Sequence, residues 1–372
     1  MIIGIPKEVK SSEFRIGITP QNVALLIKDE NEVIVQSSAG VGSGFSDKDY
    51  IDAGARIVYS AKEVYDEAVL IVKVKEPQLS EYGFLNEKHT LFCYLHLAPL
   101  RELTSVLLEK KVCAIAYETV SLDNELPLLK PMSEIAGKMA PIVAAYHLSR
   151  YQGGEGILIS GADGVAGANI LIIGAGNAGF NAAKIAIGMG ADVTVINRTM
   201  PKLQQLQIEL PSIKTFLYSS QTLGEMLKDS DIVISTVLIH GGASAPKLIT
   251  RTMLKEMRDG AVFVDIAIDQ GGTAESSKPT THTNPIFIEE GVLHYCVANM
   301  PGAYPKTSSV ALSNATISYV RKLANKGTFD AIKNDSSLAL GVNVFNGVVT
   351  NRAVAEVHNL EYKNLELYLE DK

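Results

Sequence analysis

Short apolar runs alternate with amphipathic segments along most of this chain. In the first third, the apolar runs predict buried strands at 1–5, 32–36, 68–74, 90–95 and 112–116. Apolar residues at helical spacing predict helices at 20–28, 48–53 and 101–111. The alternation continues with strands predicted at 170–173, 192–196, 212–217, 232–237, 261–266 and 293–298, and with helices at 180–190, 222–228, 251–257 and 307–324. Strands that alternate with helices in this way predict parallel sheets in an α/β fold.

Polar residues mark the expected helix starts. Thr19 is predicted to cap a helix that Pro20 begins, and Asp47 is predicted to cap the next helix. Ser133, with a glutamate directly after it, is expected to start a long amphipathic helix that runs to about Tyr151.

The length of the chain predicts two domains. Its 372 residues exceed what one hydrophobic core usually supports. Pro127 and Pro131 bracket a short segment, as is typical of a linker, so we expect a domain boundary there. The predicted fold class is α/β, with two doubly wound parallel-sheet domains.

One stretch carries a specific motif. The strand at 170–173 runs into Gly174-Ala-Gly176-Asn-Ala-Gly179, and a helical segment and a second strand follow. In this setting G-x-G-x-x-G predicts dinucleotide binding, although a Gly-rich structural turn has the same composition. Gly174 permits the tight turn, Gly176 lets the backbone approach a pyrophosphate, and Gly179 lets helix and strand pack closely. The residues expected to meet the phosphates at the helix N-terminus are Gly174, Gly176, Asn177, Ala178 and Gly179.

Composition narrows the class of protein. A formal net charge of −7 argues against nucleic acid as a main partner. The three cysteines show neither metal-site spacing nor an even-numbered framework, so we expect no metal site and a reduced, cytoplasmic protein. The N-terminus lacks the pattern of a secretory signal. The most membrane-like segment, 170–196, contains the glycine motif and several polar residues, which predicts a soluble strand–helix–strand unit and no membrane partner.

Polar residues follow several of the predicted strands. Lys75, His96 and Glu118 stand at the carboxyl ends of strands in the first half, where ligands bind in such sheets. Glu118 could orient another side chain or could be a solvated strand end. Asp269 follows a buried strand and closely precedes a glycine pair, so it could be a functional carboxylate or ordinary turn chemistry. Ser133 could donate to a phosphate, cap its helix, or do both.

The sequence resembles the alanine dehydrogenase family along nearly its whole length. Many separate blocks match in order, which makes the resemblance specific. The blocks are Gly4-Ile-Pro-Lys-Glu8, Glu13-Phe-Arg15, Thr19-Pro20, Lys73-Val-Lys-Glu-Pro77, His96-Leu-Ala, Ala116-Tyr-Glu-Thr119, Pro131-Met-Ser-Glu134, the Gly174 to Gly179 turn, 264–272 and 296–301. The N-terminal half of the related proton-translocating transhydrogenase shares several of them, but that family continues into membrane segments.

The resemblance implies a domain organisation and an activity. Residues 1–127 with 306–372 would form a substrate domain, and 128–305 a Rossmann NAD-binding domain. The implied reaction is the reversible, NAD-dependent oxidative deamination of L-alanine to pyruvate and ammonium, carried out by a homohexamer. Arg15 and Lys75 match the family positions that hold the carboxylate and the carbonyl oxygen of the substrate.

The resemblance also implies roles for residues of the second half and for one histidine. His96 matches the family's proposed acid/base, Asp269 a residue implicated in catalysis, and Asn299 one that lines the nicotinamide and substrate site. The chemistry agrees, because a carboxylate needs a cation such as Arg15 or Lys75 and proton transfer near neutral pH suits a histidine. Taken alone, Arg15 is more often a solvated surface residue and His96 more often a structural one. The further coenzyme contacts expected are Ser133, Asn197, Arg198, Lys202, Ile266, Asp269, Asn299 and Met300.

The expected coenzyme site departs from the family at one position. The second Rossmann strand ends in Asn197 where the family normally has an aspartate. Asparagine can still bond a ribose hydroxyl, but the charge that repels a 2′-phosphate is absent. Arg198 and Lys202 could pair with such a phosphate or could point to solvent. We therefore expect NAD as the primary coenzyme, with raised acceptance of NADP.

Two rival functions fit parts of the sequence. A detached transhydrogenase-like NAD(H) domain would need a membrane partner and would not deaminate alanine. A non-catalytic NAD-binding sensor would have no need of Arg15, Lys75, His96, Asp269 and Asn299 together. Alanine-dependent formation of NADH separates all three.

Overall fold

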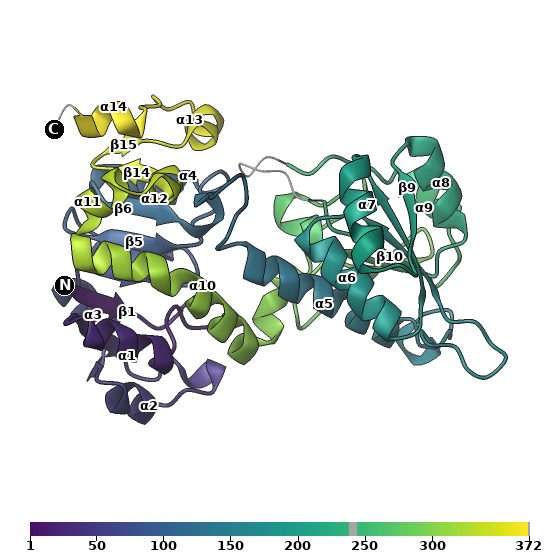
Figure 1. Ribbon diagram of the computed structural model, residues 1–372, viewed down its shortest axis with the longest axis horizontal. Coiled ribbons are helices and arrows are strands. Elements are labelled where there is room, and N and C mark those ends of the chain that lie inside the picture. The colour runs from purple at the N-terminus through teal and green to yellow at the C-terminus, as the bar shows by residue number, and fades with distance from the viewer. Residues whose placement is uncertain (238–243, 371–372) are drawn as a thin grey trace. The chain divides into compact units, whose positions relative to one another are not determined.

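The computed structural model describes residues 1–237 and 244–370. The chain divides into two compact units, Met1–Met132 with Tyr304–Lys372, and Ser133–Ala303. We call them unit 1 and unit 2. In Figure 1, unit 1 contains the purple and blue start and the yellow-green end of the chain, and unit 2 is formed by the teal and green residues that come between these segments in sequence. Unit 1 is therefore assembled from two segments that are far apart in sequence.

Unit 1 is built on a mostly parallel sheet, with eight strands among its described residues. Six strands pair in parallel in the order β3-β2-β1-β4-β5-β6, and β14 and β15 extend the β6 edge in antiparallel pairs. The strands are β1 (Ile2–Ile5), β2 (Glu32–Gln36), β3 (Arg56–Val58), β4 (Leu70–Val72), β5 (Thr90–Cys93), β6 (Cys113–Ala116), β14 (Val342–Phe345) and β15 (Val348–Val349). The order reverses between β1 and β4, and ligands of doubly wound sheets bind outside the carboxyl ends at such a point.

The helices of unit 1 correct one predicted cap and confirm the position of another. They are α1 (Pro20–Lys28), α2 (Asp47–Asp52), α3 (Ala61–Glu67), α4 (Arg101–Glu109), α10 (Pro305–Lys326), α11 (Thr328–Lys333), α12 (Ser336–Gly341), α13 (Arg352–His358) and α14 (Leu365–Glu370). Ser46, not Asp47, caps α2, because Ser46 forms a capping box with Asp49. Thr19 is the N-cap residue of α1 and Pro20 begins the helix, as predicted, but the Thr19 side chain makes no cap bond; its backbone N–H donates to Ser313 Oγ of α10 at 3.1 Å.

Unit 2 is also a doubly wound sheet. Its strands are β7 (Asn169–Ile173), β8 (Asp192–Asn197), β9 (Lys214–Leu217), β10 (Ile232–Ser235), β11 (Val262–Asp265), β12 (Ile286–Glu289) and β13 (Val292–Tyr295). The parallel strands follow the order β9-β8-β7-β10-β11-β13, the strand order of Rossmann folds, and β12 is an antiparallel edge strand. The two sheets confirm the predicted α/β class, with antiparallel edges that the pattern had not indicated.

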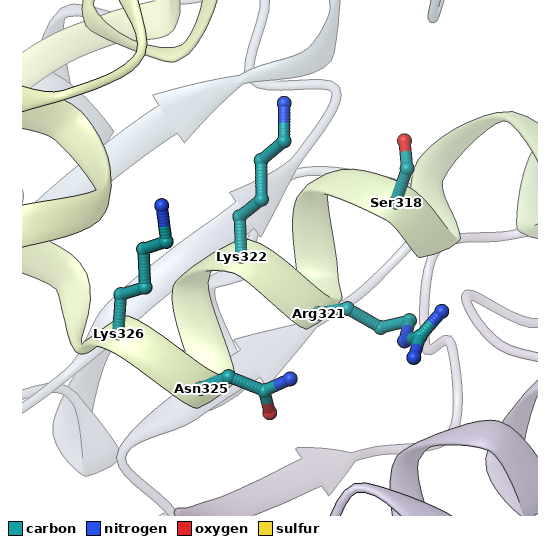
Figure 2. Close-up of a pocket in the computed structure, with 5 residues that line it drawn as sticks. All are labelled: Ser318, Arg321, Lys322, Asn325 and Lys326. Carbon is teal, nitrogen blue, oxygen red and sulfur yellow. The ribbon is translucent and has the colours of Figure 1, made fainter.

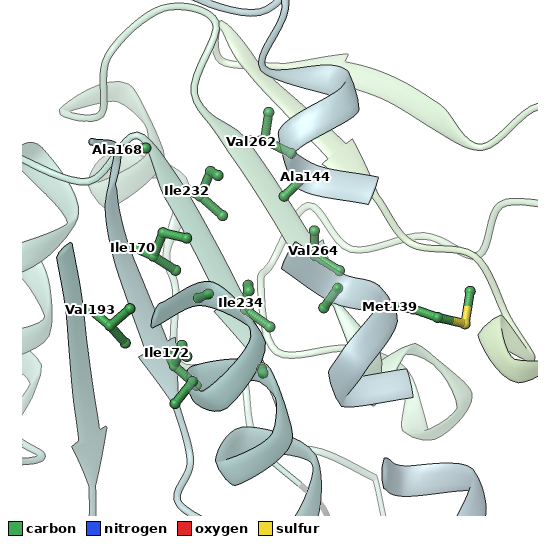
Figure 3. Packing of buried hydrophobic residues seen from close by; sticks show 14 of the residues in the cluster. Met139, Ala144, Ala168, Ile170, Ile172, Val193, Ile232, Ile234, Val262 and Val264 are labelled. Atoms are coloured by element: carbon green, nitrogen blue, oxygen red, sulfur yellow. The ribbon is translucent and has the colours of Figure 1, made fainter. Parts of the chain in front are cut away.

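Helices of unit 2 bury the apolar faces of this sheet. They are α5 (Lys130–His147), whose first three residues belong to unit 1, α6 (Asn177–Gly188), α7 (Met200–Glu209), α8 (Ser220–Lys228) and α9 (Arg251–Lys255). Figure 3 shows part of the main core, a cluster that includes Ala144 of α5 and Ile172, Ile234 and Val264 from three adjacent strands. Because β7, β10 and β11 are buried on both faces, each contains a continuous apolar run.

The long helix α5 begins at Lys130, three residues before the predicted start. Pro131 lies in its first turn, where a missing backbone N–H costs no hydrogen bond. Ser133 is therefore inside the helix, and its predicted role as the N-cap is wrong. The helix ends at His147 rather than near Tyr151, which lies in a short 3-10 segment, Arg150–Gln152.

Candidate functional site

In unit 1, the carboxyl ends of neighbouring strands bring Lys75 and His96 to one aromatic ring. Lys75 follows β4, and its Nζ lies 5.9 Å from the centre of the Tyr94 ring. The His96 imidazole stacks on the same ring, with centres 6.0 Å apart and planes inclined by 14°. The Tyr94 hydroxyl donates to Leu128 O at 2.6 Å, which holds the ring in place. Tyr94 is thus the common neighbour of two predicted site residues.

Arg15 lies in the loop after β1 and is buried, with 2% of its surface exposed. Its guanidinium forms a two-pronged pair with Glu13, with Nε to Oε1 at 2.7 Å and Nη2 to Oε2 at 2.6 Å. Its Nη1 lies 3.1 Å from Met132 Sδ. Burial opposes ionisation of Glu13, but Arg15 and the nearby positive charge of Lys75 outweigh it and lower the Glu13 pKa to about 2. Arg15 is therefore a fixed, buried cation and not a solvated surface residue.

His96 stands in a strained turn that Glu118 supports. Its φ is 46°, in the left-handed region that non-glycine residues seldom adopt. Glu118 Oε1 accepts from the backbone N–H of His96 at 2.7 Å, and both of its carboxylate oxygens lie 3.2 Å from the N–H of Leu95. His96 Nδ1 is 4.0 Å from Glu118 Oε1, beyond hydrogen-bond distance. Of the two roles left open for Glu118, the orienting one fits, and it acts through the backbone.

In unit 2, the glycine turn has the geometry that each glycine allows. Gly174 has a φ of 107°, and a Cβ there would lie 2.6 Å from Thr236 Oγ1. A Cβ at Gly179 would lie 1.9 Å from Gly174 O, so this position excludes any side chain. A Cβ at Gly176 would meet no atom within 4 Å, and Gly176 directly precedes Asn177, the first residue of α6. Open space in front of a helix N-terminus fits an approaching phosphate.

Asn197 ends β8 beside this turn. Its Oδ1 accepts from the N–H of Ala175 at 3.3 Å, and its Nδ2 donates to Thr199 O at 3.1 Å and to Thr199 Oγ1 at 3.0 Å. Arg198 and Lys202 are exposed. The structure therefore places Asn197 against the glycine turn, and leaves both cations in contact with solvent.

Asp269 and Asn299 belong to unit 2, in two loops after its strands. Asp269 is exposed on a 3-10 segment, Ile266–Gln270, that follows β11. Buried Asp265 holds this loop, because it accepts from the N–H of Ala267 at 3.1 Å and of Thr273 at 2.8 Å. Asn299 follows β13 with a φ of 63°, and its carbonyl oxygen lies 3.3 Å from His282 Nε2. Of the other expected contacts, Ile266 and Ser133 are half-buried and Met300 is buried.

Several residues that contact the predicted site residues were not evident from the sequence. Tyr94 follows a strand and precedes the predicted His96, and Glu13 stands two residues before Arg15, but neither was singled out. Glu8 and Lys73 lie inside matching blocks and carry buried charges. The signal that could have found them is a charged or aromatic residue close to a strand's carboxyl end, next to a residue already predicted.

Three further observations concern metal binding, membrane spans and a surface hollow. No group of three or more histidine, cysteine or acidic side chains in the described ranges could hold a metal ion. No helix in the described part of the chain is long and apolar enough to cross a membrane. Figure 2 shows a hollow on α10 lined by Ser318, Arg321, Lys322, Asn325 and Lys326. Its cations include Arg321, paired with Asp29 at 2.6 Å, and Lys322, paired with Asp335 at 2.5 Å.

Comparison with known proteins places the chain in a family. The family descriptions "Alanine dehydrogenase/PNT, N-terminal domain" and "Alanine dehydrogenase/PNT, C-terminal domain" match residues 4–136 and 140–352. An alanine dehydrogenase of Staphylococcus epidermidis is 50% identical over 369 residues, covering 98% of this chain and 99% of that protein. One from Halomonas elongata is 48% identical over 364 residues, covering 97% and 98%.

Solved structures agree. A structure described as L-alanine dehydrogenase superposes with a TM-score of 0.93 at 42% identity, covering 96% of this chain and 99% of that one. A transhydrogenase from Sinorhizobium meliloti, at 24% identity and a TM-score of 0.81, shares the fold; the match covers 94% of this chain and all of that one. The chain belongs to the alanine dehydrogenase/PNT family.

Proposed function

We propose that the chain catalyses the reversible, NAD-dependent oxidative deamination of L-alanine to pyruvate and ammonium. A relative that is 50% identical to this chain over nearly its full length is named alanine dehydrogenase. The observation that carries the proposal for this chain is the grouping of Lys75 and His96 on the Tyr94 ring in unit 1, together with the buried Arg15. A cation, an acid/base and a fixed guanidinium are the groups that a small amino acid and its keto acid require.

Arg15 and Lys75 bind the substrate in this proposal. The Glu13 carboxylate fixes the plane of the Arg15 guanidinium, so little side-chain freedom remains to be lost when a carboxylate binds. Lys75 is a point charge on a longer stem and suits the carbonyl oxygen of pyruvate. Both cations act in a region where burial weakens solvent screening.

His96 transfers the protons. Deamination requires a proton to leave the substrate amine and a water molecule to be activated for attack on the imine, and a histidine serves both steps near neutral pH. The ring rests on Tyr94, and 40% of the side chain is exposed, so it can exchange protons with solvent. Glu118 supports the turn that presents it.

The residues of unit 2 fit a bound dinucleotide. The open space at Gly176, in front of the N-terminus of α6, suits the pyrophosphate, and Asn197 suits the adenosine ribose. NAD, when bound, supplies the hydride acceptor for the Cα of alanine. The residues that would hold it are Ser133, Gly174, Gly176, Asn177, Ala178, Gly179, Asn197, Ile266, Asp269, Asn299 and Met300.

The test is the formation of NADH by the purified full-length protein with L-alanine, and its consumption with pyruvate and ammonium. Turnover in both directions supports the proposal. A protein that binds NADH by calorimetry but shows no turnover in either direction would be an NAD-binding sensor or a transhydrogenase-like domain. Hydride transfer between two nicotinamide coenzymes, without alanine, would identify the second of these.

We also propose that NADP acceptance is raised, because Asn197 carries no charge to repel a 2′-phosphate and Arg198 and Lys202 are exposed nearby. Asn197→Asp should improve discrimination for NAD over NADP by about 10-fold or more, since one like-charge contact costs roughly 1.4 kcal/mol. The measurement is kcat/KM with each coenzyme for both proteins. Equal discrimination by the two proteins would show that Asn197 does not set the preference.

For the assembly, we propose a cytoplasmic homohexamer, on the resemblance alone. Light scattering on the purified protein gives the subunit number directly. A monomer or a dimer at assay concentration would reject the proposed hexamer without affecting the proposed reaction.

A further inference from the structure

Glu8 lies where the strand order of unit 1 reverses. It follows β1 in the loop that leads to Arg15, and only 7% of its surface is exposed. Pairing between β1 and β4 ends at Gly4 and Ile71. On the side that faces β1, the backbone N–H groups of the chain beyond β4 therefore need other acceptors.

The Glu8 carboxylate supplies an acceptor at that point. Its Oε1 accepts from the backbone N–H of Val74 at 2.6 Å, and lies 3.4 Å from the N–H of Lys75. Two successive peptide groups thus face one carboxylate oxygen. This arrangement fixes the backbone at Lys75, and with it the direction in which the Lys75 side chain leaves the chain.

Lys73 balances the buried charge of Glu8. Its Nζ lies 3.3 Å from Glu8 Oε2 and 2.9 Å from Glu81 Oε1, and its side chain is fully buried. Tyr65 donates from its hydroxyl to the same Glu81 oxygen at 3.0 Å. The network thus joins the loop after β1, the end of β4, and the 3-10 segment Leu79–Phe84 that contains Glu81.

Stability alone does not explain this network. Removing ions from water costs much of what their attraction returns, so a buried ion pair often adds no more stability than apolar residues of the same size. Burial raises the pKa of Glu8, as expected for a charge that is expensive to hold there. Among the described residues, no group donates a hydrogen bond to Glu8 Oε2. Oε2 is in ion-pair contact with Lys73, whereas the hydrogen bonds of the carboxylate are those that Oε1 accepts from the backbone of Val74 and Lys75.

We propose that Glu8 is a positioning residue whose carboxylate fixes the backbone at Val74 and Lys75 and so directs the Lys75 ammonium toward the substrate. This inference rests on the proposed function, in which Lys75 binds the carbonyl oxygen of pyruvate. Glu8 itself touches no substrate in this proposal.

The test is steady-state kinetics of reductive amination with full-length Glu8→Gln. The amide has the shape of the carboxylate but lacks its charge, so both backbone bonds weaken and the pairing with Lys73 is lost. We expect KM for pyruvate to rise about 10-fold or more, the size expected when bonds to a charged acceptor are weakened. The Kd for NADH, measured by calorimetry, should stay within about 2-fold because Glu8 belongs to the other unit.

A double-mutant cycle separates positioning from general damage. If Glu8 acts through Lys75, Glu8→Gln should change KM for pyruvate by less than about 2-fold once Lys75→Ala is present. Tyr65→Phe is the matched control, because it removes a bond at the far end of the same network and leaves both backbone bonds of Glu8 intact. It should lower the melting temperature without raising KM.

The outcomes are distinct. The inference is overturned if Glu8→Gln leaves KM unchanged, if its effect is the same without the Lys75 side chain, or if Tyr65→Phe raises KM as much. If Lys75→Ala itself leaves KM for pyruvate unchanged, the proposed role of Lys75 is wrong and this inference falls with it. Should Glu8→Gln not fold, Glu8→Asp is judged by the same criteria, since it keeps the charge near Lys73 but withdraws it from the two N–H groups.

Discussion

At the scale of single residues, His96 combines partial exposure with a backbone conformation that its neighbours impose. A φ of 46° costs a histidine free energy, and Glu118 offsets this cost by accepting the N–H groups of Leu95 and His96. Such a turn places the ring against Tyr94 rather than along the strand. The arrangement supports an acid/base role for His96 and a supporting role for Glu118.

We expect His96→Ala and His96→Asn each to lower kcat by about 100-fold or more, the usual contribution of a positioned acid/base. Asparagine tolerates the left-handed backbone better than most residues, so it preserves the turn, but its amide cannot accept and return a proton as an imidazole does. The measurements are kcat in both directions, Kd for NADH, and the melting temperature. Recovery of activity in the asparagine variant alone would mean that the residue shapes the turn and does not transfer protons.

The pair of Glu13 and Arg15 predicts a pH dependence of stability. Because the Glu13 pKa falls from 4.5 to about 2 on folding, its contribution is fully present above pH 4.5 and is lost as the pH falls toward 2. The shift corresponds to roughly 3 kcal/mol at neutral pH. Glu13→Gln should therefore lower the free energy of unfolding at neutral pH. Below pH 4.5, the free energy of unfolding of this variant should decrease less steeply than that of the wild-type protein, as measured by urea titration.

A surface carboxylate provides the control for that experiment. Asp52 pairs with Lys48 at 2.6 Å on the exposed face of α2, and Asp52→Asn should change stability by less than about 1 kcal/mol. If Glu13→Gln and the wild-type protein lose stability in parallel as the pH falls, Glu13 is not the group that titrates.

Sequence predicted the charged residues of the site but not their partners. Lys75 and His96 stand at carboxyl ends of predicted strands, but the roles of Arg15, Lys75 and His96 came from the resemblance, since Arg15 alone is more often a surface residue and His96 more often a structural one. The pairing of Glu13 with Arg15 depends on side-chain directions in a loop, and no periodic pattern encodes these. Tyr94 became visible only as the ring that two predicted residues share. The roles of the individual site residues stay predictions.

At the scale of elements, the alternation of apolar runs and helical segments found most strands but extended several of them. The run at 68–74 contains β4, which is only Leu70–Val72. Beyond Val72 the chain stays buried, although it no longer pairs with β1 as a strand, so hydrophobicity continues after the strand ends. The start of α5 was predicted late because Pro131 was interpreted as part of a linker, whereas it lies in the first turn of the helix.

The contact between α5 and α6 gives a prediction at this scale. A Cβ at Gly137 of α5 would lie 2.2 Å from Ala178 O, in the first turn of α6. Gly137→Ala should therefore push apart the two helices next to the proposed phosphate site. We expect a loss of about 1–3 kcal/mol in stability from the overpacking, and weaker binding of NADH, as measured by melting temperature and calorimetry.

A glycine-to-alanine substitution on α6, far from this contact in sequence, is the control. A Cβ at Gly188 meets no atom within 4 Å, so Gly188→Ala should be neutral or slightly stabilising, as alanine is the better helix former. Unchanged NADH binding in Gly137→Ala would show that the spacing of these helices does not matter for the coenzyme.

At the scale of the molecule, the sequence predicted two doubly wound sheets, and the strand orders confirm them. The antiparallel edges were not predictable from the same pattern. An edge strand such as β12 or β14 has the composition of a parallel strand, and its direction is set by the neighbour on which it packs. That unit 1 is completed by residues after Ala303 was implied by the resemblance and by no local feature.

Separate cores predict separate responses to a ligand. The clusters around Ile172 in unit 2 and around Ile71 in unit 1 each consist of residues from one unit. NADH at about 100 times its Kd should stabilise the unit that holds it by roughly 2.7 kcal/mol. Hydrogen exchange followed by mass spectrometry should therefore slow most in β7, α6 and β10, and much less in β1, β4 and β5. Lys75→Ala should show the same pattern, because its side chain belongs to unit 1. Equal slowing in the strands of both units would mean that the two cores open together.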